Sequence, residues 1–177
     1  MNNFALDVLA TPQYRATLQE RYKRPGWGGS GYHHWIATAT FARELGATSV
    51  LDYGCGRGKL RESLLEFSHL KDIHEYDPGI VGKDALPSPA DLVVATDVLE
   101  HIEPDLLSNV LYHFKHLARK GIYLVIATDK AKEVLPDGRN AHLIQRPGVW
   151  WIQQLRQHGL FPCKVEQLKG VHVWIRI

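Results

Sequence analysis

Short apolar runs alternate with segments of helical periodicity along most of the chain. Buried strands are predicted over residues 49–53, 71–76, 90–96, 121–128, 163–168 and 171–175. Helices, several of which begin beside a proline or end at a glycine, are predicted over residues 12–22, 32–45, 59–67, 104–119 and 148–157. Strands and helices that alternate in this way predict an α/β fold with a mostly parallel sheet.

The lengths of two predicted connections constrain this sheet further. Lys169 and Gly170 alone join the last two strands, and so short a joint requires an antiparallel hairpin. Only 13 residues separate Asp77 from Asp91, whereas a crossover with its helix needs about a dozen residues before any strand is counted. We therefore expect a mostly parallel sheet with a C-terminal antiparallel hairpin. The crossover between its second and fourth strand positions is shortened, and residues 80–82 form at most a vestigial edge strand.

The strand over residues 49–53 runs directly into a glycine-rich turn. Asp52 precedes Gly54, Gly56 and Gly58 in the pattern D-x-G-x-G-x-G. Glycines at this spacing allow positive φ angles and let a ligand approach the backbone closely. The pattern differs from the G-x-G-x-x-G of dinucleotide-binding enzymes because the acidic residue comes before the first glycine. A carboxylate at that position suits a cationic ligand group and is a poor neighbour for a pyrophosphate.

A second motif follows the buried strand over residues 90–96, with the sequence Val-Leu-Glu-His-Ile at positions 98–102. Together with the glycine turn, it resembles the class I S-adenosylmethionine (SAM)-dependent methyltransferases of the small single-domain type. The resemblance covers residues 48–177 and implies a Rossmann-like sandwich that binds SAM. It also implies methyl transfer to oxygen or nitrogen of a small-molecule acceptor. Residues 1–47 are expected to form an N-terminal helical lid or substrate segment, because such enzymes place a lid there.

An acidic residue 21 positions after Gly56 adds to the expected cofactor site. Asp77 ends the second predicted strand, and a carboxylate about 20 positions after the glycines binds ribose hydroxyls in nucleotide-binding α/β folds. An ordinary Asp-Pro-Gly turn is the alternative. The resemblance places Asp84 at the exocyclic amine of adenine. The full set of residues expected at the cofactor is Asp52, Gly54, Cys55, Gly56, Gly58, Asp77, Pro78, Asp84, Asp97 and Val98.

Methyl transfer from a sulfonium releases a neutral thioether, so the protein mainly aligns the reactants and excludes water. A general base is needed only where the acceptor carries a proton with a high pKa, and histidine suits that role. His142 follows the strand over residues 121–128 and is expected to face the ligand crevice, while His101 lies in the second motif. Both are catalytic candidates. Candidates for the acceptor pocket are Trp27, Tyr32, Trp35 and Asn140.

Other chemistries are less well supported by the sequence. Asp97, Asp129 and Asn140 fall near strand ends and would suit Mg²⁺, but acidic residues are common there without a metal, so no metal is predicted. Residues 95–98 lack the Pro-Pro-aromatic element of DNA amino-methyltransferases. The Pro162-Cys163 pair lies far from the position of a cytosine-methylating nucleophile.

Composition sets the remaining expectations. A net charge of +2 does not indicate nucleic acid, and no apolar run approaches the ~20 residues of a membrane helix. The chain has only two cysteines, which favours a reducing compartment. Residues 1–4 lack signal-peptide features, so a cytoplasmic location is expected. Oligomeric state is open. Three alternatives also remain: a SAM-binding partner without catalysis, a methyltransferase that modifies nucleic acid or protein, and an α/β enzyme for another nucleotide.

Overall fold

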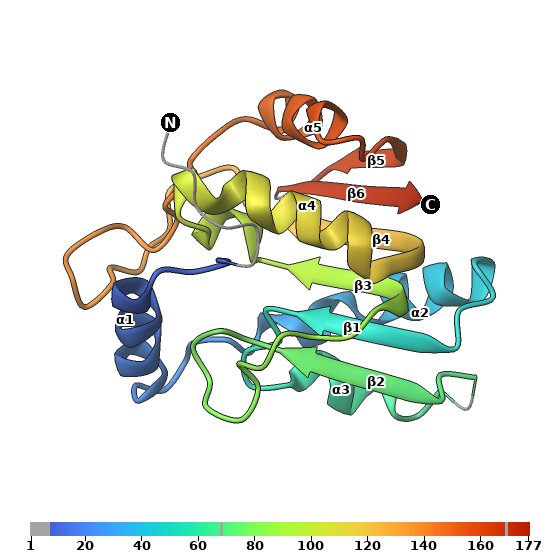
Figure 1. The fold of residues 1–177 in the computed structure, drawn as a ribbon, viewed down its shortest axis with the longest axis horizontal. Coiled ribbons are helices and arrows are strands. Elements are labelled where there is room, and N and C mark those ends of the chain that lie inside the picture. Colours follow the sequence, from blue (N-terminus) through green and yellow to red (C-terminus); the bar gives the residue numbers. More distant parts are fainter. Residues whose placement is uncertain (1–7, 68, 169) are drawn as a thin grey trace.

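The computed structural model describes residues 8–67, 69–168 and 170–177, so residues 1–4 and Lys169 lie outside the described residues. Six strands form one sheet in the order β2-β1-β3-β4-β6-β5 (Figure 1). Strands β1 to β4 are parallel, and β6 is antiparallel to both β4 and β5, as predicted. The strands are β1 (Ser49–Tyr53), β2 (Asp72–Tyr76), β3 (Ala90–Thr96), β4 (Ala118–Ile126), β5 (Pro162–Gln167) and β6 (Val171–Arg176).

Helices cover both faces of this sheet, which confirms the predicted three-layer sandwich. Alternate residues of each central strand point to opposite faces, so Val93 packs beneath α4 and α5 whereas Val94 packs beneath α2 and α3. Figure 1 shows α4 and α5 on the near face and α2 and α3 behind the sheet. The α-helices are α1 (Pro12–Tyr22), α2 (Trp35–Glu44), α3 (Lys59–Leu64), α4 (Leu107–Leu117) and α5 (Gly148–Gln157).

Several predicted helix boundaries were wrong by part of a turn or more. The helix expected over residues 104–119 is a 3₁₀ turn (Pro104–Leu106) followed by α4, which ends at Leu117 because Ala118 is already extended with ψ 122°. Ala118 instead begins β4 by pairing with Ala90 of β3. The helix expected over residues 32–45 begins as a 3₁₀ segment, Ser30–His34. Sheet pairing and packing override local propensity at these ends.

The shortened crossover is confirmed, but it contains no edge strand. Residues 77–89 connect β2 to β3 without a helix or strand. The backbone N–H of Asp77 donates to Lys83 O at 2.9 Å, and that of Lys83 donates to Ile80 O at 2.9 Å. Residues 80–82 therefore form a compact turn, and the suggestion of a vestigial strand there was wrong. Turn hydrogen bonds satisfy the backbone groups that a strand would have paired.

The order in which the chain adds strands to the sheet reverses between β1 and β3, and this is where a ligand crevice is expected. β1 is followed by β2 on one side, whereas β3 and β4 lie on the other. In open α/β sheets the crevice forms at the carboxyl ends of the strands beside such a reversal. Figure 1 shows α1 beyond these strand ends, next to the loop that follows β4. Tyr14 and Leu18 of α1 pack with Leu135 and Ala141 of that loop.

Candidate functional site

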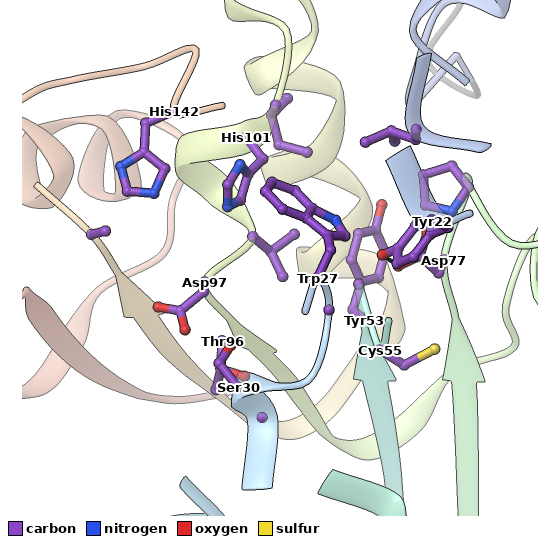
Figure 2. A pocket seen from close by; sticks show the side chains of 18 of the residues that line it. Tyr22, Trp27, Ser30, Tyr53, Cys55, Asp77, Thr96, Asp97, His101 and His142 are labelled. Carbon is purple, nitrogen blue, oxygen red and sulfur yellow. Dashed lines mark hydrogen bonds between the residues drawn. The ribbon is translucent and has the colours of Figure 1, made fainter. Parts of the chain in front are cut away.

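A cavity of about 480 Å³ opens at the carboxyl ends of β1, β2 and β3, beneath α1 and the glycine-rich loop after it (Figure 2). Its volume is in the range of small-molecule sites, and most of its lining is apolar with a few polar groups. The residues predicted to bind cofactor or substrate that line it are Trp27, Asp52, Gly54, Cys55, Asp77, Pro78, Asp97 and Val98, and both predicted catalytic histidines, His101 and His142, line it too.

Asp52 is the buried acid of this cavity. Its carboxyl group is 3% exposed, and its Oδ2 atom has no hydrogen-bond partner among the described residues. Burial, followed by the nearby charge of Glu75, raises the pKa of Asp52 to about 8, although Lys83 opposes the shift. A buried carboxylate without a partner is costly, so this oxygen fits a ligand that brings a cation.

The three glycines of the turn have different roles. Gly54, Gly56 and Gly58 all adopt positive φ angles (77°, 51° and 76°). Gly54 lines the cavity, whereas Gly56 and Gly58 do not. A Cβ atom at Gly56 would lie 2.4 Å from Gly28 O, because the loop after α1 lies against the turn at this point. Gly56 therefore provides the space into which that loop closes.

Arg57 ties the same loop to the glycine turn. Its backbone N–H donates to Gly28 O at 2.7 Å, and its guanidinium donates to Trp27 O at 2.8 Å. The guanidinium also donates to the carbonyls of Tyr22 and Arg24, both at 3.0 Å. These bonds hold the loop over the cavity, where the Trp27 ring lies edge-on to His101 with centroids 5.1 Å apart.

Asp77 is linked to three donors from separate parts of the chain. Its Oδ2 accepts from Gly56 N–H at 3.0 Å and from the Tyr22 hydroxyl at 2.7 Å, while Oδ1 accepts from Gly79 N–H at 2.9 Å. Burial raises the pKa of Asp77, and these hydrogen bonds oppose that rise. The carboxylate already binds a hydroxyl from α1, which is the type of donor that a ribose offers.

The two candidate bases lie together at the opposite end of the cavity (Figure 2). The rings of His101 and His142 are edge-to-face with centroids 4.9 Å apart. His101 Nδ1 lies 2.7 Å from Ala141 O, and His142 Nδ1 contacts Asp129 O. Burial lowers the pKa of His101 to about 4, so this ring is neutral near pH 7. Because a carbonyl only accepts, the Nδ1 atom of each ring carries a proton, and neutral His101 keeps the lone pair of its Nε2 atom.

The structure places the other predicted residues away from the cavity lining. Asp84 accepts from Gly82 N–H at 3.1 Å within the crossover turn. Tyr32 is 47% exposed, and Trp35 packs against Phe67 behind the sheet. The amide of Asn140 bonds to Ala131 N–H and Ala131 O within its own loop. Helix α2, which the sequence analysis grouped with the lid, also packs on the sheet, so the segment over the cavity is α1 and the loop after it.

Two residues of the cavity lining, Cys55 and Asp97, have features that the sequence did not reveal. Burial raises the pKa of the Cys55 thiol, so it stays protonated and is no nucleophile. Asp97 has a φ of 56°, the one positive φ among the described residues other than glycine. Such a strained residue at the end of a strand is typical of a functional site.

Sequence analysis missed Tyr22, Ser30, Thr96 and Glu100 as site residues. Tyr22, Ser30 and Thr96 line the cavity, but no spacing rule links α1 or residue 30 to the ends of β1 and β3. Glu100 lies in the second motif between two assigned residues, so the signal was present. It is fully buried at 0% exposure, which only the structure shows.

Comparison with known protein families resolves the assignment. Residues 15–169 match the family model described as a methyltransferase domain. The chain belongs to this methyltransferase family. The predicted family, fold and enzyme class are therefore confirmed, and SAM is the cofactor that class I methyltransferases use. A comparison with curated protein sequences found no match.

Solved structures of methyltransferases share the fold. The 1,6-didemethyltoxoflavin-N1-methyltransferase of Burkholderia thailandensis, solved with that compound and S-adenosylhomocysteine, is 19% identical with a TM-score of 0.69. The match covers 95% of this chain and 91% of that one. The magnesium protoporphyrin IX methyltransferase of Synechocystis PCC 6803, solved with bound SAH, is 17% identical with a TM-score of 0.60, covering 96% and 95% of the chains. At these identities the likeness concerns the fold. None of the described helices is long and apolar enough to cross a membrane.

Proposed function

We propose that this methyltransferase transfers the methyl group of SAM to oxygen or nitrogen of a small-molecule acceptor bound in the cavity beneath α1. The observation that carries the proposal is Asp52, a buried carboxylate with an unpartnered oxygen at the end of β1. The amino-acid tail of SAM carries an ammonium group, which supplies the missing cation. The two neighbours solved with S-adenosylhomocysteine support the same assignment.

The remaining residues of the cavity divide into two groups. Gly54 and Cys55 give backbone access beside Asp52, and Asp77 accepts hydroxyl donors at the end of β2. These positions support a cofactor that binds between the ends of β1 and β2. Trp27, His101 and His142 form the other end, where an acceptor has access to an aromatic wall and two imidazole nitrogens. Among the predicted acceptor residues, Trp27 has the position for this role.

Methyl transfer from SAM requires the protein to align the two reactants more than it requires a general acid or base. When bound, SAM supplies an activated methyl group whose departure from sulfur leaves a neutral thioether. The loop held by Arg57 lines part of the cavity, where it limits the access of water to the reacting atoms. Neutral His101 is an available proton acceptor only for an acceptor that must lose a proton. We infer that the orientation of acceptor and SAM beneath α1 and the loop after it provides most of the rate enhancement.

A small acceptor is favoured over a macromolecule by the size of the site. The cavity of about 480 Å³ has room for a cofactor and a compact molecule, and the described part of the chain has no large insertion beside it. The alternative of a SAM-binding partner without catalysis is less favoured, because two imidazoles and a strained aspartate line the same cavity. A turnover assay distinguishes an enzyme from a partner that only binds SAM. Formation of S-adenosylhomocysteine with a panel of phenols, heterocyclic amines and carboxylates would support an enzyme, and binding without turnover on any acceptor would support a partner.

We expect SAM binding to release a proton from Asp52. The pKa of about 8 in the free protein means that this carboxyl holds a proton at pH 7, and an adjacent ammonium favours the ionised form. Affinity should therefore rise roughly tenfold per pH unit between pH 6 and 7.5 and level off near pH 8. The same raised pKa makes the free protein lose stability as the pH rises from about 4 towards 8. Calorimetry in two buffers of different ionisation enthalpy measures the released proton.

The Asp52→Asn variant is the control for this proton release. It keeps the side-chain volume but cannot ionise, so the proton release should vanish and SAM affinity should fall at least tenfold. A dinucleotide such as NAD⁺, which carries a pyrophosphate, should not bind to the wild-type protein. Wild-type SAM binding that shows no proton release would place the ammonium elsewhere. Tight NAD⁺ binding would replace the proposed function with nucleotide chemistry of another kind.

A further inference from the structure

A group of three metal-ligating side chains lies at the acceptor end of the cavity. One ligand atom each from Glu100, His101 and His142 lies within 4.8 Å of the other two. The ligand atoms of a tetrahedral ion are about 3.4 Å apart when each bond is about 2.1 Å long. Shifts of at most about 0.8 Å in each side chain would therefore bring all three atoms to bonding distance. His142 lies in the loop after β4, and the other two residues lie in the turn after β3.

Glu100 provides an independent sign that this group lacks a partner. The side chain is fully buried, and its Oε1 accepts from Ala127 N–H at 3.0 Å. The other oxygen, Oε2, has no hydrogen-bond partner among the described residues. The nearby charge that acts on Glu100 is that of a second carboxylate, Asp97. Two carboxylates and a buried unpartnered oxygen are an arrangement that a divalent cation would stabilise.

Both imidazoles are oriented as metal ligands usually are. The Nδ1 atoms of His101 and His142 donate hydrogen bonds to the carbonyls of Ala141 and Asp129, respectively. In a neutral ring with its proton on Nδ1, the lone pair of Nε2 is available to a metal ion. A backbone carbonyl on the far nitrogen is the common outer contact of a metal-bound histidine, since it fixes both the tautomer and the ring orientation. A ring in this tautomer needs no further proton shift to bind an ion.

We propose that Glu100, His101 and His142 bind one divalent transition-metal ion beside the methyl-transfer site. Two nitrogen ligands and one carboxylate suit Zn²⁺, Co²⁺ or Mn²⁺, whereas Mg²⁺ and Ca²⁺ prefer oxygen ligands throughout. The two histidines line the cavity, and the Asp97 carboxylate faces the same space (Figure 2). Three protein ligands leave an open position towards the cavity, as in catalytic metal sites.

The open position suggests the class of acceptor, a step that rests on the proposed function. An acceptor with a hydroxyl or carbonyl oxygen next to the methylated atom binds the ion through that oxygen. The ion then holds the acceptor in line with the methyl group and lowers the pKa of a coordinated hydroxyl, whose proton passes to solvent. With the ion bound, His101 and His142 act as metal ligands. They then no longer serve as the general bases that sequence analysis proposed.

The test begins with metal binding by the tag-free protein and needs no SAM. After treatment with a chelator, the protein is titrated with Co²⁺ and followed by visible absorption and by elemental analysis. We expect one Co²⁺ per chain, displaced by Zn²⁺ but not by Mg²⁺ at the same concentration. The His142→Ala variant should bind Co²⁺ at least tenfold more weakly, since even loss of an outer contact costs about that much. The Glu100→Gln variant keeps the side-chain volume and the Ala127 bond and should show the same weakening.

His116→Ala is the matched control for non-specific binding among the ten histidines. Its Nδ1 also bonds to a carbonyl, Tyr112 O at 2.8 Å, but it lies exposed on α4 away from the cavity, so Co²⁺ binding should not change. Failure of the wild-type protein to bind Co²⁺ would overturn the proposal, as would an equal loss in His116→Ala. So would unchanged binding in both ligand variants, whose folding is checked by melting temperature. SAM binding measured on the same samples separates this outcome from a failure of the proposed function.

Discussion

The Gly56→Ala variant is expected to lose SAM binding by at least 100-fold and to lose about 3 kcal/mol of unfolding free energy. A left-handed φ of 51° costs an alanine about 1–2 kcal/mol by itself. The added Cβ atom would also lie 2.4 Å from Gly28 O and 2.8 Å from Gly28 Cα. Backbone cannot yield as a flexible side chain can, so the loop after α1 must move away from the turn. Calorimetric titration with SAM and denaturant unfolding measure the two effects.

Gly138→Ala provides the matched control for the clash at Gly56. Gly138 also has a positive φ, 85°, but nothing lies within 4 Å of a Cβ atom placed there. The substitution should cost about 1–2 kcal/mol of stability and leave SAM affinity unchanged. If Gly56→Ala behaves in the same way as this control, then the contact between Gly56 and Gly28 does not shape the cofactor site.

The Asp77→Ala variant is expected to unfold at least 3 kcal/mol more easily and to bind SAM too weakly to measure. Removal of the carboxylate leaves Gly56 N–H, Gly79 N–H and the Tyr22 hydroxyl without their acceptor. Each buried donor left unsatisfied costs about 1–3 kcal/mol. The glycine turn, the end of β2 and the lid helix are all linked through this one side chain. Chemical denaturation and a direct binding assay measure the two losses separately.

Asp84→Ala tests whether the second predicted acid contributes in the same way. Asp84 bonds to Gly82 N–H in an exposed turn and does not line the cavity. The change should cost no more than about 0.5 kcal/mol and leave SAM binding within twofold. A large loss of SAM affinity here would restore the adenine role that the family resemblance suggested. Intact SAM binding by a destabilised Asp77→Ala protein would show that Asp77 has a structural role alone.

Most of the sheet was predictable because its signal is local. Residues 90–96 form an unbroken buried strand, and the D-x-G-x-G-x-G turn combines a strand end, flexible backbone and a carboxylate within seven positions. The short joint before β6 determined the direction of the hairpin. Helix ends were less predictable, as Ala118 shows, because pairing with β3 overrides the preference of the residue itself.

The candidate site was predictable only in part, because some of its residues come from segments that carry no local signal. Asp52 lies near the end of β1, Gly54 and Asp77 directly follow β1 and β2, and strand order brings all three to one edge of the sheet. Tyr22 and Trp27 come from a segment with no recognised motif, and their places depend on how α1 packs against the loop after β4. Asn140 was expected to meet substrate, but its amide is occupied by the loop that contains it.

The amino-acid sequence by itself determined the layered α/β fold, the methyltransferase family and the glycine turn proposed to bind the cofactor. These depend on periodicity and on residues that are neighbours in the chain. Tertiary structure alone decided which distant side chains share an environment. It buried Asp52 and Glu100 without full sets of partners and placed His142 against His101, 41 positions earlier. Burial and long-range proximity set the charge and the free lone pairs of these groups, and neither quantity is present in local sequence.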